Sequence, residues 1–325
     1  MKAAVIGIGA MGANHARVYA EKGILAAVSD QDEALLEKAR KRYTARTYKS
    51  YRELIDTEKP DIVSVAVPTK MHEEVATYAL KNGVHTLLEK PIASTHDEAA
   101  GIIKAAKNAK LMIGHIERFN PAVIELKRQF DAGVLGRIFK IDVNRVGPFP
   151  SRIRDVGVVI DLAVHDLNVI SYLVNSRAKR VYAETEKRIH TLHEDLLSGV
   201  LKYESGEICN LNINWLTPTK IRKIYVTGEK GMFVANYLSQ DLYFYENDES
   251  KGHQDYADLM RGVSEGRMIK MKVDKKEPLL LEIEHFIDCV ENNRPVLVTG
   301  EDGAAALYLA EKLVESSRQG KVIEL

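Results

Sequence analysis

The first third of the chain alternates short apolar runs with stretches in which apolar residues recur every three or four positions. Short apolar runs are typical of buried strands, and the longer spacing is typical of amphipathic helices. Because polar residues rarely interrupt the runs, we expect a parallel sheet with helices on both faces, a doubly wound α/β domain. The expected strands are 3–8, 24–29, 61–66, 84–88 and 111–114, and the expected helices are 32–42, 70–81 and 95–107.

The pattern changes after about residue 116. The segment 180–245 is rich in β-forming residues and turn signals, which predicts about six strands in a mostly antiparallel sheet. We therefore predict two domains, 1–118 and an α+β domain over 119–325, whose C-terminal helices can pack back on the first domain. Before and after this sheet we expect helices at 121–132, 158–174, 279–292 and 302–317, a strand at 138–145 and a loop at 146–157.

Composition narrows the function classes. The 325 residues are 45% hydrophobic, enough for a large core, and 46 basic residues balance 46 acidic ones. This balance argues against a nucleic-acid partner, which a basic excess would favour. Cys209 and Cys289 match no metal-ligand or disulfide spacing, so we expect reduced thiols and no metal. No apolar run reaches the length of a membrane span, and the apolar start of the chain fits a strand and turn better than a signal peptide. We expect a cytoplasmic protein.

A glycine pattern follows the first expected strand. Gly7, Ile8 and Gly9 are followed by Met11 and Gly12, which makes a Gly-x-Gly-x-x-Gly sequence before an expected helix. Such glycines also occur in ordinary turns, but a position between a strand and a helix favours a dinucleotide site. There, backbone N–H groups and the helix N-terminus receive a pyrophosphate.

Asp30 ends the second expected strand. A carboxylate at this place accepts hydrogen bonds from the hydroxyls of the adenosine ribose and repels a 2′-phosphate. The next residues, Gln31 to Glu33, include no arginine for such a phosphate. A simple turn residue is the alternative, but the pattern as a whole predicts NAD rather than NADP.

Two further motifs suggest chemistry. Glu89-Lys90-Pro91 follows an expected strand at its carboxyl end, where open α/β sheets bind ligands, and a cis bond before Pro91 would aim Lys90 inward. Asp161 and His165 lie four residues apart in a largely apolar helix, so they share a face. A satisfied Asp–His pair in the core is the alternative. A site is favoured because imidazole titrates near neutral pH and can take a hydroxyl proton.

Taken in order, these three motifs resemble the Gfo/Idh/MocA family of oxidoreductases over essentially the whole chain, including Val67-Pro68-Thr69 with His72 and the segment 300–303. The resemblance implies a Rossmann domain followed by an α+β domain. It also implies catalytic roles for Lys90, Asp161 and His165 and cofactor-binding roles for Pro68, His72, Glu89 and Lys90.

A narrower resemblance covers the segments 114–121, 145–161 and 214–219. They look like those of family members that oxidise the C3 hydroxyl of UDP-N-acetylglucosamine, giving a 3-keto sugar that an aminotransferase converts to the amino sugar. Val156 in place of a frequent glycine, and Asn168 in place of a frequent acid, leave the exact substrate open. Arginine suits bidentate contact with phosphate, although any single one can instead belong to a basic surface loop. The candidates for the diphosphate are Arg118, Arg145, Arg152 and Arg154.

The expected second-domain sheet has helices on one side only, so its other face needs a cover. The strands expected at 208–215 and 221–227 carry apolar side chains, including the only tryptophan, Trp215. We therefore predict a homodimer or homotetramer formed through this sheet. The alternatives in function are another sugar or polyol dehydrogenase, such as an inositol dehydrogenase, a reductase that runs the reverse reaction, and a non-catalytic NAD-sensing regulator. The presence of Lys90 together with Asp161 and His165 argues against the regulator.

Overall fold

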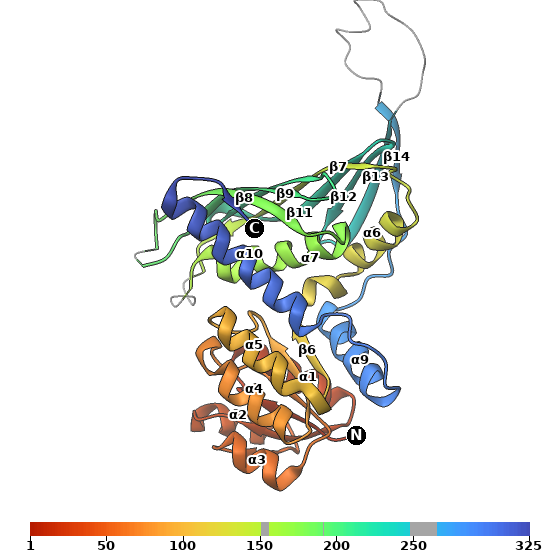
Figure 1. Ribbon diagram of the computed structural model, residues 1–325. Coiled ribbons are helices and arrows are strands. Elements are labelled where there is room, and N and C mark those ends of the chain that lie inside the picture. The colour runs from red at the N-terminus through yellow and green to blue at the C-terminus, as the bar shows by residue number, and fades with distance from the viewer. Residues whose placement is uncertain (151–155, 191, 248–264) are drawn as a thin grey trace, which may run out of the picture. The chain divides into compact units, whose positions relative to one another are not determined.

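The computed structural model describes residues 1–150, 156–190, 192–247 and 265–325. The chain forms two compact units (Figure 1). The first unit contains residues 1–116 and 277–308, and the second contains 117–276 and 309–325. The C-terminal segment therefore returns to the first unit before the chain ends in the second. The helix α10 (Gly300–Gln319) is divided between the two.

The first unit is a doubly wound α/β domain, as predicted. Its described residues form a six-stranded parallel sheet in the order β3-β2-β1-β4-β5-β6. The strand order reverses between β1 and β4, which is the place where such sheets bind ligands at their carboxyl ends. The strands are β1 (Ala3–Ile6), β2 (Leu25–Ser29), β3 (Arg46–Tyr48), β4 (Ile62–Val65), β5 (His85–Glu89) and β6 (Leu111–Gly114). The helices are α1 (Ala10–Glu21), α2 (Glu33–Arg42), α3 (Tyr51–Glu58), α4 (His72–Lys81), α5 (His96–Ala105) and α9 (Pro278–Glu291).

Local sequence explains these elements. The β1 residues are all buried, as an internal strand covered on both faces requires. The side chain of Asp32 caps α2, and Thr95 with Glu98 forms a capping box at α5. The pattern missed β3 and α3 because β3 is a three-residue edge strand with an exposed first residue, Arg46, and carries no apolar run.

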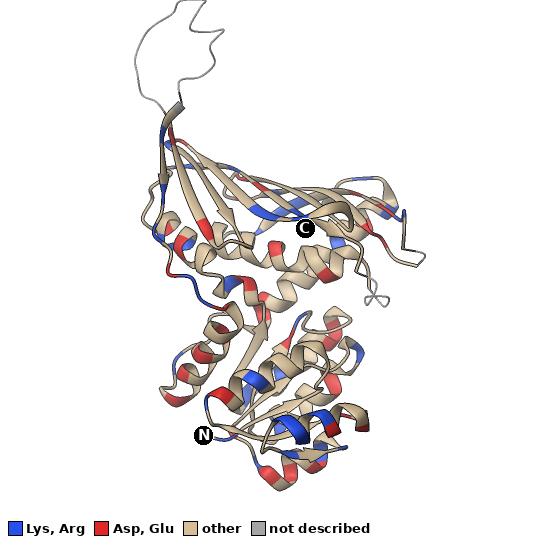
Figure 2. Ribbon diagram, turned by 180° about the vertical axis from the view of Figure 1, so that it is seen from behind, with Lys and Arg blue, Asp and Glu red and all other residues tan. Residues whose placement is uncertain are grey.

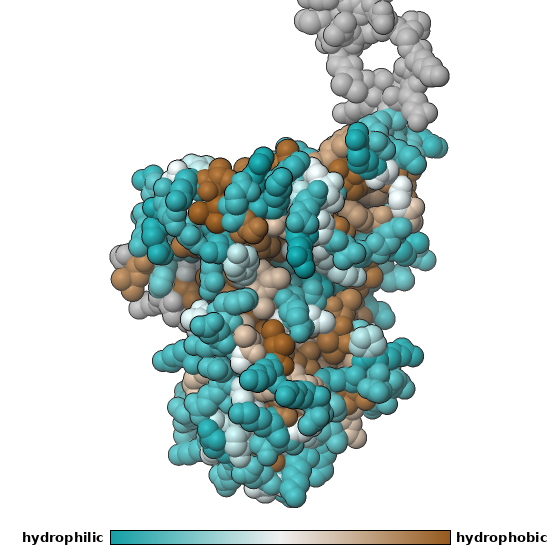
Figure 3. All heavy atoms as spheres, in the orientation of Figure 1, coloured by the Kyte–Doolittle hydropathy of each residue, from teal (hydrophilic) through white to brown (hydrophobic). Residues whose placement is uncertain are grey.

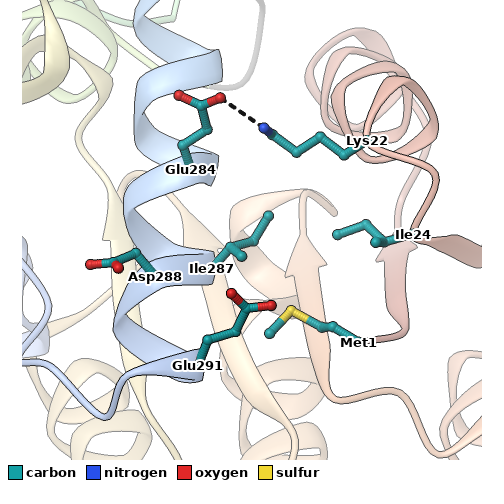
Figure 4. A pocket seen from close by; sticks show the side chains of 7 residues that line it. All are labelled: Met1, Lys22, Ile24, Glu284, Ile287, Asp288 and Glu291. Atoms are coloured by element: carbon teal, nitrogen blue, oxygen red, sulfur yellow. Dashed lines mark hydrogen bonds and ion pairs between the residues drawn. The ribbon is translucent and has the colours of Figure 1, made fainter.

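The helix α9 packs beside α1, and a pocket of about 430 Å³ lies next to it. Figure 4 shows the side chains that line this pocket. An ion pair of 2.7 Å joins Lys22 Nζ to Glu284 Oε1 across this pocket. Met1 and Ile24, which also line it, precede β1 and β2 in the chain. The pocket thus lies at the amino ends of the strands, the edge opposite to the one where ligands bind, and is not a candidate for the dinucleotide site.

The second unit contains a nine-stranded sheet within the described residues, in the order β14-β13-β12-β11-β7-β10-β9-β8-β15. Neighbouring strands are antiparallel except for the parallel pair β7–β10. The helices α6 (Pro121–Asp131) and α7 (Val164–Val174) lie against one face (Figure 1). The strands are β7 (Ile138–Pro148), β8 (Ala178–Glu186), β9 (Leu196–Tyr203), β10 (Ile208–Asn214), β11 (Leu216–Gly228), β12 (Gly231–Asn236), β13 (Asp241–Asn247), β14 (Glu265–Lys270) and β15 (Ile323–Glu324).

The segment expected to hold about six strands contains the six strands β8 to β13, and the sheet is mostly antiparallel, as predicted. With β7, β14 and β15 the described sheet has nine strands, and one pair, β7–β10, is parallel. The loop expected at 146–157 begins later, because β7 continues to Pro148 and Val146 pairs with both Asn214 and Ile221. A proline and a glycine in this stretch suggested a turn, but cross-strand pairing keeps the backbone extended on both sides.

Most of the apolar residues predicted to make the free sheet face adhesive lie on the other face, and Ile208 is the exposed exception in β10. Trp215 is 3% exposed and packs in the core with Leu211 and Ile213, so its predicted place on the free face is wrong. Alternate residues of β10 point to the opposite face, where Asn210 donates a hydrogen bond of 2.8 Å to Asp142. Because the side chains of a strand alternate between the two faces, most of the apolar side chains of this strand lie on the face that the helices cover. The free face of the sheet is therefore more polar than expected.

Charges of both signs are interspersed over the helices of the first unit (Figure 2), and hydrophilic side chains cover most of its surface in the view of Figure 3. Figure 2 shows no long stripe of one sign on the described helices of this unit. In the part of the chain that the structure describes, no helix is both long enough and apolar enough to cross a membrane.

Candidate active site

The glycine loop between β1 and α1 has the geometry that a pyrophosphate requires. Gly7 has a φ of +82°, and a Cβ there would lie 2.7 Å from the Ala66 carbonyl oxygen. A Cβ at Gly12 would lie 1.7 Å from the Gly7 carbonyl oxygen, whereas one at Gly9 would meet no atom within 4 Å. Gly7 therefore allows the tight turn, and Gly12 allows the helix α1 to pack closely against this turn. Gly9 leaves space at the N-terminus of α1 for a phosphate.

Asp30 directly follows β2 and braces this loop. Its Oδ2 accepts a hydrogen bond of 2.8 Å from the Ile8 amide, and its Oδ1 accepts one of 2.9 Å from the Asp32 amide. A carboxylate has about four acceptor positions, so both oxygens can still accept hydrogen bonds from ribose hydroxyls. The Ile8 side chain is buried, while Met11, in the first turn of α1, is exposed.

The loop after β4 contains Pro68 and leads through η1 (Thr69–Met71) into α4. His72 begins α4, and its side chain is buried. Its Nε2 contacts the Val67 carbonyl oxygen at 3.0 Å and its Nδ1 contacts the Pro91 carbonyl oxygen at 2.9 Å. The imidazole predicted to bind the cofactor is thus used inside the unit, where it joins the loops that follow β4 and β5.

Lys90 directly follows β5 at its carboxyl end, and the Lys90–Pro91 bond is cis, as predicted. Glu89 is buried, and its Oε1 lies 3.0 Å from His15 Nε2. Its Oε2 accepts a hydrogen bond of 3.2 Å from the Lys90 amide. Burial disfavours the carboxylate, but the hydrogen bond from His15 and the Lys90 charge outweigh it and lower the pKa of Glu89. A carboxylate therefore lies beside the lysine.

In the second unit, Asp161 and His165 lie on successive turns of one helical segment, and both are half-buried. Asp161 lies in η4 (Val159–Ala163), which is a π-helical turn, and His165 lies in the first turn of α7. The prediction of a regular α-helix over this stretch is wrong at its start. A π-turn is rare and often occurs at functional sites, because the wider turn changes which side chains share a face.

The start of this helical segment is fixed by the segment before β9. Glu194 accepts the Val158 amide with its carbonyl oxygen, at 2.8 Å, and the Val159 amide with its side chain, at 3.3 Å. A Cβ at Gly157 would lie 2.0 Å from the Glu194 carboxylate, so this glycine lets the carboxylate reach the helix N-terminus. Asp195, next in the chain, accepts three backbone amides of the preceding turn. The turn and the helix are thus held together.

Two of the four predicted substrate arginines are buried in the second unit. Arg145 is 1% exposed, binds both carboxylate oxygens of Asp166 and donates a hydrogen bond of 3.0 Å to Glu117. Burial opposes its charge, but the two carboxylates outweigh it and raise the pKa of Arg145. Arg118 donates a hydrogen bond of 2.7 Å to Asn168. The Arg145 guanidinium is occupied within the unit, which argues against the phosphate contact expected for it.

Arg152 and Arg154, the other two candidates, lie outside the described residues.

Arg222 on β11 is a candidate that the sequence pattern did not single out. It lies opposite Arg145 in the sheet register, and its side chain is 27% exposed. Its nearest carboxylate oxygen, on Glu117, is 3.8 Å away and already accepts from Arg145. Burial and the Arg145 charge lower the pKa of Arg222, and Asp161 acts in the opposite direction. The sequence does contain a signal for Arg222. It lies two residues from the buried Ile224 on the same strand, so its side chain lies on the same, covered face of the sheet.

These features define the class of protein. A parallel sheet with a switch point, a glycine loop that a Cβ would fill, and a carboxylate after β2 fit the pyrophosphate and ribose of a dinucleotide. The first unit is the nucleotide-binding domain of an oxidoreductase, and its cofactor is NAD.

Comparison with protein families supports this class. Residues 1–115 match the NAD-binding Rossmann-fold domain of the Gfo/Idh/MocA oxidoreductase family, and residues 127–325 match the C-terminal α/β domain of the same family. The chain belongs to this family, as its motifs predicted.

Several relatives are similar along the whole chain. A UDP-N-acetylglucosamine 3-dehydrogenase of Acidithiobacillus ferrooxidans is 29% identical over 317 residues, which cover 95% of each chain. The myo-inositol 2-dehydrogenase of Thermotoga maritima is 25% identical over 344 residues, which cover 100% of this chain and 99% of that one. The solved structure of the A. ferrooxidans enzyme superposes with a TM-score of 0.87, at 27% identity and 98% coverage of both chains.

Proposed function

We propose that the protein oxidises the C3 hydroxyl of UDP-N-acetylglucosamine to the 3-keto sugar with NAD. The main support is the similarity to a UDP-N-acetylglucosamine 3-dehydrogenase over 95% of both chains. The catalytic motif residues Lys90, Asp161 and His165 are present, so the chain has the groups that such an oxidation needs. The product would supply the synthesis of a 3-amino sugar, and a pathway aminotransferase is the expected consumer.

In this proposal each catalytic residue has a separate role. His165 takes the proton of the sugar hydroxyl as a general base. Lys90 donates a hydrogen bond to the same oxygen and stabilises the negative charge that develops on it. Asp161 orients one of these two groups. NAD supplies the hydride acceptor when it is bound.

We propose Arg222 as a contact for the negatively charged part of the substrate, in place of Arg145. Among the described residues its guanidinium makes no hydrogen bond, only the 3.8 Å ion pair with Glu117. A guanidinium that is largely buried without hydrogen bonds is ready to bind an anion bidentately. The charge of Asp161 acts on Arg222, so this arginine belongs to the same part of the unit as the catalytic motif.

A second candidate function is the oxidation of an uncharged polyol, because the inositol dehydrogenase relative also matches the full chain. The decisive experiment incubates the protein with NAD and a panel of UDP-sugars, inositols and free sugars, and follows NADH absorbance and product mass. A ketone trap or a coupled aminotransferase removes the keto product. We expect turnover with UDP-N-acetylglucosamine and a mass loss of two hydrogens. Turnover with inositol alone would contradict the proposal and support a polyol dehydrogenase. NAD binding without turnover of any substrate would favour an NAD-sensing regulator.

We also propose a homodimer or homotetramer formed through the free face of the large sheet, in the cytoplasm. Support for the interface is now limited to scattered apolar residues on the sheet, such as Val200 and Ile208, which are 42% and 43% exposed. Support for the compartment is that both cysteines are buried and form no disulfide. Light scattering tests the assembly, and a monomer at micromolar concentration would contradict it.

A further inference from the structure

Lys90 lies between two residues that buried histidines hold. His15, on α1, contacts the Glu89 carboxylate at 3.0 Å, and His72, on α4, contacts the Pro91 carbonyl oxygen at 2.9 Å. The two histidines are 0% and 1% exposed. We propose that His15 and His72 are positioning residues, which fix the Glu-Lys-Pro segment so that Lys90 meets the substrate oxygen in one orientation. This inference rests on the proposed role of Lys90.

His15 belongs to a chain of buried hydrogen bonds. A carboxylate can only accept, so His15 Nε2–H donates to Glu89, at 3.0 Å. The His15 Nδ1 contacts Ser64 Oγ at 2.9 Å, and Ser64 Oγ lies 2.8 Å from the Tyr19 hydroxyl. Burial raises the pKa of Tyr19, so the phenol keeps its proton. Both ring nitrogens of His15 therefore have a buried partner, and the chain of contacts ends on the Glu89 carboxylate.

Ser64, His15 and Glu89 are the residue types of a hydrolytic triad, but their burial excludes that use. Ser64 is 0% exposed within β4, and its hydroxyl already makes hydrogen-bond contacts with Tyr19 and His15. A nucleophile must reach a substrate carbonyl, and this hydroxyl cannot. The network is a support for Glu89.

Glu89 has little freedom to move away from Lys90. A Cβ on Gly114 would lie 3.3 Å from the Glu89 carboxyl carbon and from its Oε1, so the carboxylate lies against the backbone of β6. His15 holds one oxygen and the Lys90 amide the other. The lysine whose ammonium group would donate a hydrogen bond to the reacting oxygen therefore follows a carboxylate that is fixed in place.

Comparison with a second buried carboxyl shows what His15 contributes to the ionisation of Glu89. Glu282, on α9, is 0% exposed, and among the described residues neither of its oxygens has a hydrogen-bond partner. Burial and the charge of Glu89 raise its pKa, so Glu282 is protonated while Glu89 is ionised. The two buried carboxyls differ in their hydrogen-bond donors. The donor from His15 is the one that makes Glu89, rather than Glu282, the ionised carboxyl.

His72 secures the other side of the segment. Burial lowers the pKa of His72, so the imidazole is neutral and donates to one of its two carbonyl neighbours at a time, Val67 or Pro91. These carbonyls belong to the loops after β4, which borders the switch point, and after β5, the next strand in the sheet. His15 lies on the helix that starts at the glycine loop. The glycine-loop helix α1 and the loop after β4, which would bind the cofactor, therefore also hold Glu89 and Pro91, the two neighbours of Lys90.

The kinetic test compares His15→Ala with His15→Gln, whose amide can replace the Nε2–H donor. A misplaced catalytic group costs on the order of a hundredfold in rate. We expect H15A to lose roughly ten- to a hundredfold in kcat with KM for NAD nearly unchanged, and H15Q to recover a large part. His72→Ala should act in the same direction. The matched control is His85→Ala at the other end of β5, where His85 accepts the Lys110 amide; it should leave kcat unchanged.

A second measurement does not depend on the substrate. Acetic anhydride at a limiting dose labels lysines in proportion to their free amine, and peptide mass spectrometry reads the label on each. We expect Lys90 to be labelled several-fold faster in folded H15A than in wild type, with Lys22 and Lys104 as unchanged internal references. If no substrate is turned over, the proposed function fails while this labelling still decides the inference. Folded H15A with wild-type kcat and wild-type labelling of Lys90 would overturn it.

Discussion

In the first unit, the buried Glu89 carboxylate is held by His15 and a backbone amide, whereas in the second unit the buried Arg145 guanidinium lies between two carboxylates. The first arrangement fixes a carboxylate next to Lys90. The second contains its own counter-ions and leaves its neighbour Arg222 with a carboxylate that is already used. In the proposed mechanism, buried charge therefore serves the catalytic lysine in the first unit, whereas in the second unit it holds strands and helices together.

The largest expected effect concerns the proposed catalytic groups. Lys90→Ala and His165→Ala should each lower kcat by about a hundred- to ten-thousandfold, because a general base or a charge at the reacting oxygen contributes on that order. The wild-type rate should rise with pH through the neutral range, and H165A should lose this rise. The control is His96→Ala, an exposed histidine on α5.

Circular dichroism and NAD titration keep this test interpretable. Variants that are folded, bind NAD and remain near fully active would end the assignment of both residues. If H165A unfolds, His165 is a structural residue, as Arg145 is. The contrast between a catalytic role in one unit and a structural role in the other would then be lost.

Arg145→Met should act on stability rather than on chemistry. It leaves the buried carboxylates of Asp166 and Glu117 without their partner, and breaking a buried ion pair costs about 3–5 kcal/mol. Urea unfolding measures the loss. Arg145→Met with Asp166→Asn should recover part of it. Arg137→Met, which removes an arginine that is 75% exposed and 3.4 Å from Glu229, should change the midpoint little. A stable Arg145→Met protein with a raised KM would instead return Arg145 to the substrate site.

Arg222→Gln should raise KM for a nucleotide sugar. A hydrogen bond to a charged group contributes about 1.5–3 kcal/mol, which corresponds to roughly ten- to a hundredfold. The effect should be much smaller for a free sugar without phosphate. Lys223→Gln, the next residue on β11 and on the other face of the sheet, is the matched control. An equal change with charged and uncharged substrates would show that Arg222 supports the fold and does not bind the anion.

Asp30→Ala should reduce the preference for NAD over NADP by about tenfold, since the carboxylate that would repel a 2′-phosphate is lost. It should also weaken NAD binding, because Asp30 accepts the Ile8 amide of the glycine loop. Asp32→Ala, which removes only the cap of α2, is the control. Tighter binding of NADP than NAD by the wild type would contradict the interpretation of Asp30.

Much of the first unit could be predicted from the sequence because its strands are buried on both faces and its glycines have a fixed task. The second unit could be predicted less well. Edge strands such as β14 and β15 carry no apolar run, and the π-turn at Asp161 leaves no mark in the spacing of hydrophobic residues. Arg145 was assigned to a phosphate because its partner Asp166 comes 21 residues later in the chain, and only the fold shows the pair.

The same limit applies to the buried networks. The sequence places Glu89 beside Lys90, but His15 is 74 residues away from Glu89 and Ser64 is 49 residues away from His15. A histidine in the first turns of α1 looks like any polar residue of an exposed helix. Its role depends on the parallel order of β1, β4 and β5, which brings the three side chains together.

The smallest expected effect concerns Glu282, which differs from Glu89 in having no hydrogen-bond donor among the described residues. The raised pKa of Glu282 means that the folded protein binds a proton that the unfolded chain releases above its ordinary pKa of 4.5. Its contribution to stability is therefore full below about that pH and is lost as pH rises toward the folded-state pKa. Glu282→Gln keeps the shape of the protonated acid and has no proton to lose. The variant should match wild type near pH 5 and be more stable near pH 8, by on the order of 1 kcal/mol or more.

Urea midpoints at the two pH values measure this difference. Glu284→Gln, two residues further along α9 and partner of the partly exposed Lys22, is the control and should not change the pH dependence. If Glu282→Gln and wild type lost stability in parallel, Glu282 would be ionised in the folded protein. Glu89 and Glu282 would then both carry charge in the first unit, and His15 would no longer distinguish them.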